Sequence, residues 1–244
     1  MLHISIKAEP IFSIGEFHVT NSLFTAAIVL VLTLLLSIFY VTQINKKNKN
    51  KLFYLVHFAV SSVYKLIESV LGDKTPMFFP ILGTFFFFIL FQNWFGLIPG
   101  VGSILIKTME HGEEVFVPLL RGNNADLNTT IMLGLFAFVL IQYNGFKYLG
   151  LDYLKKFLNF KNPIGFFSGI LELVGEFSKI ISFAFRLFGN IFAGEVLLAV
   201  IAFLVPVLAT FPFLLLEVFV GMIQALVFSM LTAVFISTAI AKHH

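Results

Sequence analysis

Long apolar segments alternate with short polar ones along this chain. Residues 22–42 contain no charged side chain, and they have about the 20-residue length that a helix needs to cross the hydrocarbon core of a bilayer. Uncharged apolar segments of similar length follow at 77–98 and 127–146. The pattern therefore predicts a membrane-spanning helix in each of these three segments.

The last third of the chain has longer apolar segments, over 163–206 and 211–241, with no strong turn inside either. At about 1.5 Å per residue, helices of these lengths extend about 60 Å and about 45 Å, against about 30 Å of hydrocarbon. Ordinary helix tilts average about 20° and do not absorb this excess. We therefore expect a long, strongly inclined helix hairpin that turns near Pro206.

Lysines set the expected orientation. The segments 45–51 and 147–161 are rich in lysine, and the positive-inside rule places both in the cytoplasm. The polar segment 101–126, which is not biased toward lysine, then forms an outer loop. The N-terminus is expected outside and the C-terminus in the cytoplasm. Residues 52–70 are less apolar and predict a helix that lies near the cytoplasmic interface or packs on the bundle.

Composition supports a membrane protein. The chain has 244 residues, of which 59% are hydrophobic and 12% are charged, whereas soluble domains carry about 25% charged residues. We expect an all-α, polytopic fold with about five membrane helices plus the interfacial helix, in a single integral membrane domain over residues 1–244. The absence of cysteine excludes disulfides and thiolate metal sites. A net charge of +3 gives no reason to expect nucleic-acid binding, and no cofactor is expected.

Charged side chains in the first long segment follow one helix face. Glu172, Glu176, Lys179 and Arg186 occupy positions i, i+4, i+7 and i+14, and these steps return to nearly the same side of a helix. Asn190 falls on the same stripe. This face of the predicted helix is polar, while its other faces are rich in Phe, Leu, Ile and Val.

The hairpin also predicts polar layers between its two helices. Glu195 and Glu217 are equally far from Pro206 along the chain, one before it and one after it, so a turn there places them at the same depth. Arg186 and Gln224 are further from the turn, at nearly equal separations from it. Their expected depths differ by less than one helical turn, so they form a second layer.

Structural roles compete with functional ones at several of these positions. Lys179 and Glu172 can form an i,i+7 ion pair, and Asn190 and Gln224 can hydrogen-bond between helices. Glu217 alone can be a packing residue that keeps its proton. These alternatives stay open at the level of the sequence.

Arg186 is harder to explain by structure alone. An arginine at the centre of a spanning helix costs about 2.5–3.5 kcal/mol on insertion scales, and its guanidinium stays protonated. Carboxyl groups near such a cation inside a membrane are typical of proton and ion pathways. We therefore predict that this layer of side chains handles ions.

Several motifs resemble subunit a of bacterial F-type ATP synthases. They are "RLFGNIFAGE" at 186–195, "LE" and "SK" at 171–172 and 178–179, "ADLNTT" at 125–130, "FGLIPG" at 95–100 and "IQALVFSMLTAVF" at 223–235. They cover nearly the whole chain, in order. The resemblance implies a membrane stator without catalytic chemistry of its own, in a bacterial plasma membrane. Its partners would be the c-subunit ring, the b-subunit peripheral stalk, the rest of the complex and the lipid bilayer.

The resemblance also implies roles for particular residues. Arg186 matches the stator arginine that faces the carboxylate of each passing c subunit. Residues of the outer half-channel would be Glu195, Glu217, Asp126, Asn190 and Gln224, and those of the cytoplasmic half-channel would be Glu172, Lys179 and Ser182. Some relatives have a histidine at one of the two carboxyl positions, whereas this chain has Glu at both.

Two other classes of protein compete with this interpretation. A self-contained proton or cation transporter commonly shows internal repeats and a complete substrate site, and the sequence contains no repeat. A membrane scaffold would tolerate alanine in place of Arg186. In the stator family the coupling ion, H⁺ or Na⁺, is set mostly by the c subunit.

Overall fold

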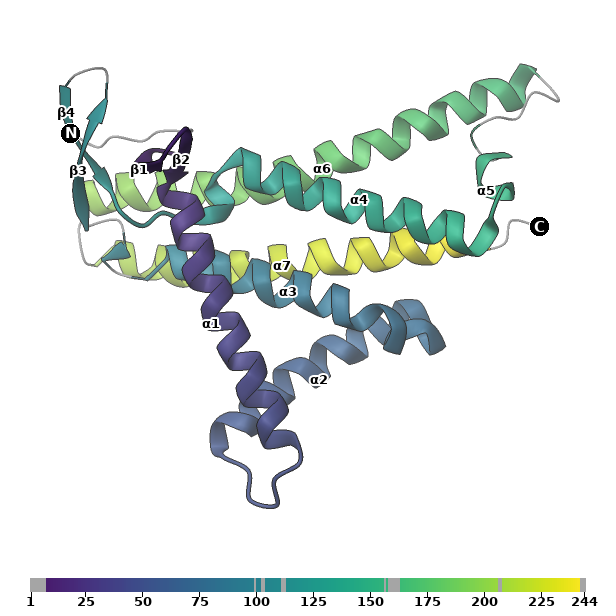
Figure 1. The fold of residues 1–244 in the computed structure, drawn as a ribbon, viewed down its shortest axis with the longest axis horizontal. Helices are drawn as coiled ribbons and strands as arrows, with labels where there is room; N and C mark the ends of the chain where they lie inside the picture. The colour runs from purple at the N-terminus through teal and green to yellow at the C-terminus, as the bar shows by residue number, and fades with distance from the viewer. Residues whose placement is uncertain are drawn as a thin grey trace.

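A computed structural model of the chain describes residues 8–98, 100–101, 104–110, 113–155, 157, 163–205 and 208–241. The structure is dominated by helices (Figure 1). Their bounds are α1 (Asn21–Ile44), α2 (Lys51–Leu71), α3 (Thr75–Gly96), α4 (Leu127–Leu149), α5 (Asp152–Lys155), α6 (Pro163–Leu204) and α7 (Thr210–Ile240). Short 3₁₀ helices, η1 (Gly72–Lys74) and η3 (Asn123–Ala125), precede α3 and α4.

The all-α, membrane-spanning fold class is confirmed. Five helical stretches of the described residues are long and apolar enough to cross a membrane: Asn21–Ile44, Lys51–Gly96, Leu127–Leu149, Ile164–Leu204 and Thr210–Ile240. The second stretch contains both α2 and α3, which are separated only by η1. The chain is therefore a multi-pass membrane protein.

The long helices α6 and α7 set the length of the molecule. They have 42 and 31 residues, so α6 extends about 63 Å. Figure 1 shows both helices lying along the longest axis, while α1 runs at a steep angle to them. If α1 crosses the bilayer near its normal, α6 and α7 are strongly inclined. Pro206, where we expect the hairpin to turn, lies outside the described residues.

The core forms where α4 and α3 pack on this pair. Helix α4 contacts both α6 and α7, and α3 lies along α7. Aromatic rings fill the centre: Phe228 of α7 lies edge-on to Phe85 of α3, with ring centroids 5.3 Å apart, and it also contacts Phe183 of α6 at 4.8 Å. Such aromatic contacts are favourable beyond the area they bury.

Helix α2 packs on the bundle through its C-terminal half. Val63, Ile67 and Leu71 are buried there, and the helix contacts α3 and α7. The sequence allows residues 52–70 either to lie near the cytoplasmic interface or to pack on the bundle. The C-terminal half of α2 packs on the bundle. Tyr54, Leu55 and Phe58, nearer the start of α2, remain exposed.

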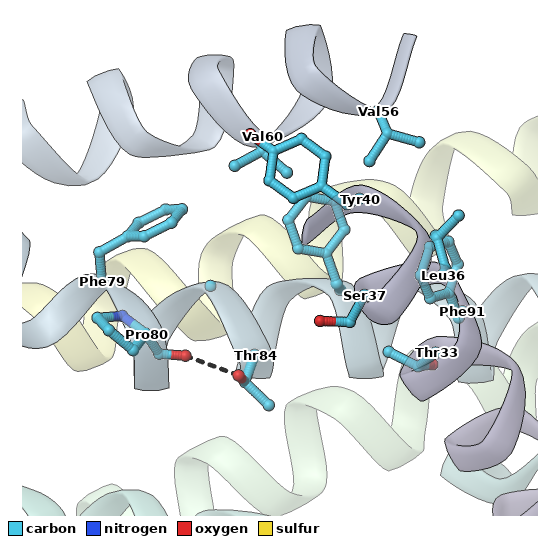
Figure 2. Close-up of a pocket in the computed structure, with 12 residues that line it drawn as sticks. Thr33, Leu36, Ser37, Tyr40, Val56, Val60, Phe79, Pro80, Thr84 and Phe91 are labelled. Atoms are coloured by element: carbon cyan, nitrogen blue, oxygen red, sulfur yellow. Dashed lines mark hydrogen bonds between the residues drawn. The ribbon is translucent and has the colours of Figure 1, made fainter. Parts of the chain in front are cut away.

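Helices α1, α2 and α3 line a half-open apolar pocket of about 230 Å³ (Figure 2). Tyr40 of α1 points toward Val60 of α2 across this space. The polar group of Thr84 in its wall is already satisfied, because Oγ1 donates to the Pro80 carbonyl at 2.6 Å. None of the lining residues belongs to α6 or α7, so this pocket is separate from the charged side chains of the hairpin.

Two β-hairpins, which the sequence did not lead us to expect, lie at one end of the molecule. Strands β1 (Pro10–Ile14) and β2 (Phe17–Thr20) pair antiparallel, as do β3 (Leu105–Glu110) and β4 (Glu113–Pro118). Gly15 in the first turn has a φ of 65°, which glycine adopts without strain. In Figure 1 these strands lie where α6 ends and α7 begins, and we call this the hairpin end; α5 marks the opposite end.

Candidate functional site

Arg186 lies on an exposed face of α6. Its Nη2 donates to the Ser182 hydroxyl, one turn earlier, at 2.9 Å. Among the described residues, no carboxylate lies within ion-pair distance of this guanidinium. Arg186 and Ser182 line a cavity of about 240 Å³ together with Lys179 and Phe235. A permanent cation is therefore presented at the surface of a helix that is apolar enough to span a membrane.

Lys179 is held by a buried acid. Its Nζ donates to Glu176 Oε1 at 2.7 Å and lies 4.4 Å from the ring centroid of Phe235. The Glu176 side chain is only 4% exposed. The i,i+7 pair with Glu172, one alternative from the sequence, is thus replaced by an i,i+3 pair with Glu176. The shorter spacing places the two side chains directly above one another on the helix.

Two further side chains form a partly buried network with Glu176. Gln142 of α4 donates from Nε2 to Glu176 Oε2 at 2.8 Å, and its Oε1 accepts from the Tyr153 hydroxyl of α5 at 2.9 Å. Burial and the negative charge of Glu176 raise the pKa of Tyr153 to about 12. A side chain at Gly145 would collide with the Tyr153 ring. Sequence reasoning missed Gln142 and Tyr153, because only the packing of α4 and α5 on α6 brings them together.

Glu172 is half-buried and lies further along the same face of α6. It lines a polar depression of about 340 Å³ together with Ser168, Glu176 and Lys179. Lys179 also lines the cavity at Arg186. The structure therefore brings Glu172, Lys179, Ser182 and Arg186 of α6 into two adjoining hollows, and Phe235 of α7 also lines the one at Arg186.

Glu195 and Glu217 lie at the same level nearer the hairpin end. Glu217 of α7 is 6% exposed, and a Cβ atom at Gly194 of α6 would collide with its carboxylate. The glycine therefore makes room for the acid next to Glu195. This proximity agrees with the equal separation of the two residues from the expected turn.

Asn190 and Gln224 are both half-buried, on α6 and α7. Within the part of the chain that the structure describes, neither side chain makes a hydrogen bond. The interhelical hydrogen bonds considered from the sequence are therefore not observed there, and both amides remain available to water or to a partner.

Asp126 is a buried N-cap of α4. Its Oδ1 accepts from the Asn128 backbone N–H at 3.0 Å, and its Oδ2 accepts from the Ser22 hydroxyl of α1 at 2.9 Å. A capping acid satisfies a backbone donor that the first helical turn leaves free. Asp126 thus ties α1 to α4, a structural contribution that the sequence did not reveal.

Arg121 is a site residue that sequence reasoning did not single out. Its Nε lies 3.7 Å from Glu195 Oε2. The residue precedes η3, which packs against α6 as well as α1, α3 and α4. Arg121 is the other arginine of the chain, and that rarity was the one signal the sequence offered.

Buried amides link the same region to α3 and α7. Asn124 of η3 donates from Nδ2 to Asn93 Oδ1 of α3 at 2.6 Å, and Asn93 Nδ2 donates to the Gly221 carbonyl of α7 at 2.9 Å. Both asparagines are almost fully buried. Polar contacts of this kind fix how the helices meet at the hairpin end.

Charged and amide side chains gathered between long helices of a membrane-spanning bundle define an ion-handling membrane protein. A family model described as ATP synthase A chain matches residues 23–237, and the chain belongs to this family. It is also 37% identical over 185 residues to ATP synthase subunit a of Gloeobacter violaceus, an alignment that covers 74% of this chain and 69% of that protein. Membership makes the chain a membrane subunit of ATP synthase, with a general role in proton transport and ATP synthesis.

Proposed function

We propose that this chain supplies a fixed arginine and two offset half-channels to a rotating ring of c subunits. The observation that carries the proposal is the position of Arg186. Its guanidinium is exposed on a candidate membrane span and has no carboxylate within ion-pair distance among the described residues. A charge in such a place is stabilised by an acid on a neighbouring subunit, and the carboxylate of a c subunit supplies that acid.

The outer half-channel delivers protons to the ring. A proton enters past Asp126, passes through Glu217 and Glu195, and neutralises the carboxylate of a c subunit. The common level of Glu195 and Glu217 supports this transfer, and Asn190 and Gln224 provide polar positions beside it. Once neutral, the ring site turns into lipid without the cost of burying a charge.

The cytoplasmic half-channel releases the proton after nearly a full revolution. The hollows lined by Glu172, Lys179, Ser182 and Arg186 support this path. Arg186 favours ionisation of the arriving carboxyl group by its positive charge. Because a guanidinium does not give up its proton, it also blocks a direct leak between the two half-channels.

The energy per proton explains why such a leak matters. An elementary charge that moves through 100 mV supplies about 2.3 kcal/mol, so several protons are needed for each ATP. The chain carries no catalytic residue in this proposal, because the ATP chemistry belongs to the catalytic head of the complex.

The proposal also includes the surroundings of the subunit. Its partners are the c ring, the b-subunit peripheral stalk and the rest of the synthase, and residues 1–244 form one integral domain in a bacterial plasma membrane. The N-terminus lies outside and the C-terminus in the cytoplasm, an orientation supported by the lysine-rich segments 45–51 and 147–161 through the positive-inside rule.

The test is ATP-driven proton pumping in inverted membrane vesicles that carry Arg186→Ala, with assembly checked by co-purification of the other subunits. We expect an assembled complex that does not pump. Lys65→Ala, which removes an exposed cation from α2, is the matched control and should pump normally. Pumping by assembled Arg186→Ala would overturn the proposal. Proton conduction by the purified chain alone in liposomes would favour the self-contained transporter.

A further inference from the structure

The ion pair between Arg121 and Glu195 connects the outer loop to α6. Guanidinium and carboxylate are 3.7 Å apart, and their side chains are 11% and 31% exposed. The pair is thus more protected than an ordinary surface salt bridge, whose strength is limited by water and by side-chain freedom. Glu195 is also one of the two acids at the common level described above.

The backbone around Arg121 is fixed from two sides. Its N–H donates to the hydroxyl of Thr25, a buried residue of α1, at 3.1 Å. On the other side, a Cβ atom at Gly96 would lie 3.0 Å from the Cα atom of Gly122. The loop therefore packs closely on the end of α3, and the guanidinium reaches Glu195 from a fixed base.

The loop also contacts the carboxylate directly. A Cβ atom at Gly122 would lie 2.9 Å from Glu195 Oε1. One carboxylate oxygen thus packs against the loop backbone while the other faces the guanidinium. Contacts at both oxygens define one orientation of the Glu195 side chain.

We propose that Arg121 is a positioning residue of the outer half-channel, which holds the ionised carboxylate of Glu195 against the outer loop and releases it when Glu195 takes up a proton. The inference rests on the proposed function. In the step itself, a proton from the outer water binds one carboxylate oxygen and forms an O–H bond. Arg121 keeps its proton and its charge, so protonation removes the charge–charge attraction between the two groups.

The release gives uptake a direction. An ionised Glu195 stays turned toward the outer loop, where protons arrive, and a neutral Glu195 is free to turn toward the ring. Arg121 thus acts through Glu195 and never carries the proton. Arg186 acts at the far side of this transfer, so the two arginines have different tasks.

Pumping rates of assembled synthase in inverted vesicles test this inference. Arg121→Gln should pump roughly tenfold more slowly, an effect between those of exposed and buried ion pairs. Arg121→Lys, which keeps the charge, should recover most of the rate. Lys107→Gln, which neutralises another cation of the outer loop on β3, should pump like the unmodified complex.

Coupling to Glu195 separates positioning from a purely structural role. Glu195→Asp withdraws the carboxylate from Arg121 but can still bind a proton. Adding Arg121→Gln to Glu195→Asp should cost much less than tenfold, because the contact is already weakened. Equal losses in both backgrounds, or a normal rate in Arg121→Gln alone, would overturn the inference.

A second variant covers the case in which Arg121→Gln does not assemble. Gly122→Ala keeps both charges but pushes the Glu195 carboxylate off the loop, so pumping should fall several-fold; an unchanged rate contradicts the inference. The outcome is separable from that of the proposed function. If Arg186→Ala abolishes pumping while the Arg121 and Gly122 variants pump normally, only the positioning role fails.

Discussion

The two arginines of the chain sit in opposite environments. Arg121, before η3, faces Glu195 within the same chain and has a side chain that is 11% exposed. Arg186, in the middle of α6, is exposed and bonds only to the hydroxyl of Ser182 in the described part of the chain. The first cation is satisfied internally, whereas the second is presented outward.

This difference shows how one chain can use the same side chain for two purposes. An internally paired arginine fixes the position of an acid, and its removal weakens one contact. An outward-facing arginine in a membrane span is costly until a partner arrives, so its removal costs the interaction with that partner. The environment of the guanidinium, rather than its chemistry, decides which task it performs.

After Arg186→Ala, the largest loss of pumping is expected from a substitution at Glu217. No cation pairs with its carboxylate in the described residues, so Glu217→Gln removes the exchangeable proton and little else. We expect pumping to fall at least about a hundredfold, the size of effect that positioned proton donors and acceptors supply, with assembly intact.

The control for Glu217 is Glu217→Asp, which keeps a titratable group and should retain part of the rate. Pumping by Glu217→Gln at the rate of the unmodified complex would assign Glu217 to packing. The contrast between charges held for structure and charges held for transport would then rest on Arg186 alone.

The helices follow from local features of the sequence. Uncharged apolar segments identify α1, α3 and α4 because a membrane span needs a nearly fixed length of apolar helix. The length of α6 and α7 follows equally from the long apolar segments over 163–205 and 211–240, neither of which contains a strong turn. The two β-hairpins did not follow, because short polar segments carry weak strand patterns and their pairing depends on contacts such as that of β1 with β3.

The site follows from the sequence only in part. Positions along one helix, such as those of Glu172, Lys179 and Arg186, are fixed by helical periodicity and could be predicted. Contacts between elements could not, because Glu195 and Arg121 are far apart in the sequence and meet only in the folded chain. The same holds for Glu176 and its partner on α4. Such contacts depend on how helices pack, which a single sequence does not encode locally.

A smaller effect on pumping is expected at Asp126, where a structural role and a transport role predict different results. Asp126 caps α4 and accepts a hydrogen bond from Ser22, so a purely structural role predicts that Asp126→Asn is nearly neutral, because asparagine caps helices as well as aspartate. A role at the proton entrance predicts pumping several-fold slower in an assembled complex of normal thermal stability. Dye-quench measurements of pumping, together with thermal dissociation of the complex, distinguish the two. Normal pumping by the asparagine variant would remove Asp126 from the proton path.

Tyr153 tests the network at the opposite end, where we expect the smallest effect. Tyr153→Phe removes the hydroxyl that donates to Gln142 and should destabilise the subunit by about 1 kcal/mol, the net value of one hydrogen bond. Tyr54→Phe, an exposed change on α2, is the control in a thermal dissociation assay.

The pH dependence of stability checks the same residue. The pKa of Tyr153 is raised to about 12 by burial and by the charge of Glu176, so the folded chain keeps a proton that the unfolded chain loses above about pH 10. This contribution to stability is therefore present below about pH 10 and falls as the pH rises toward about 12, and Tyr153→Phe should remove that part of the decline. An equal decline in both proteins would show that the phenol is not held by the Gln142–Glu176 network. Lys179 would then owe its position beside Arg186 to Glu176 alone.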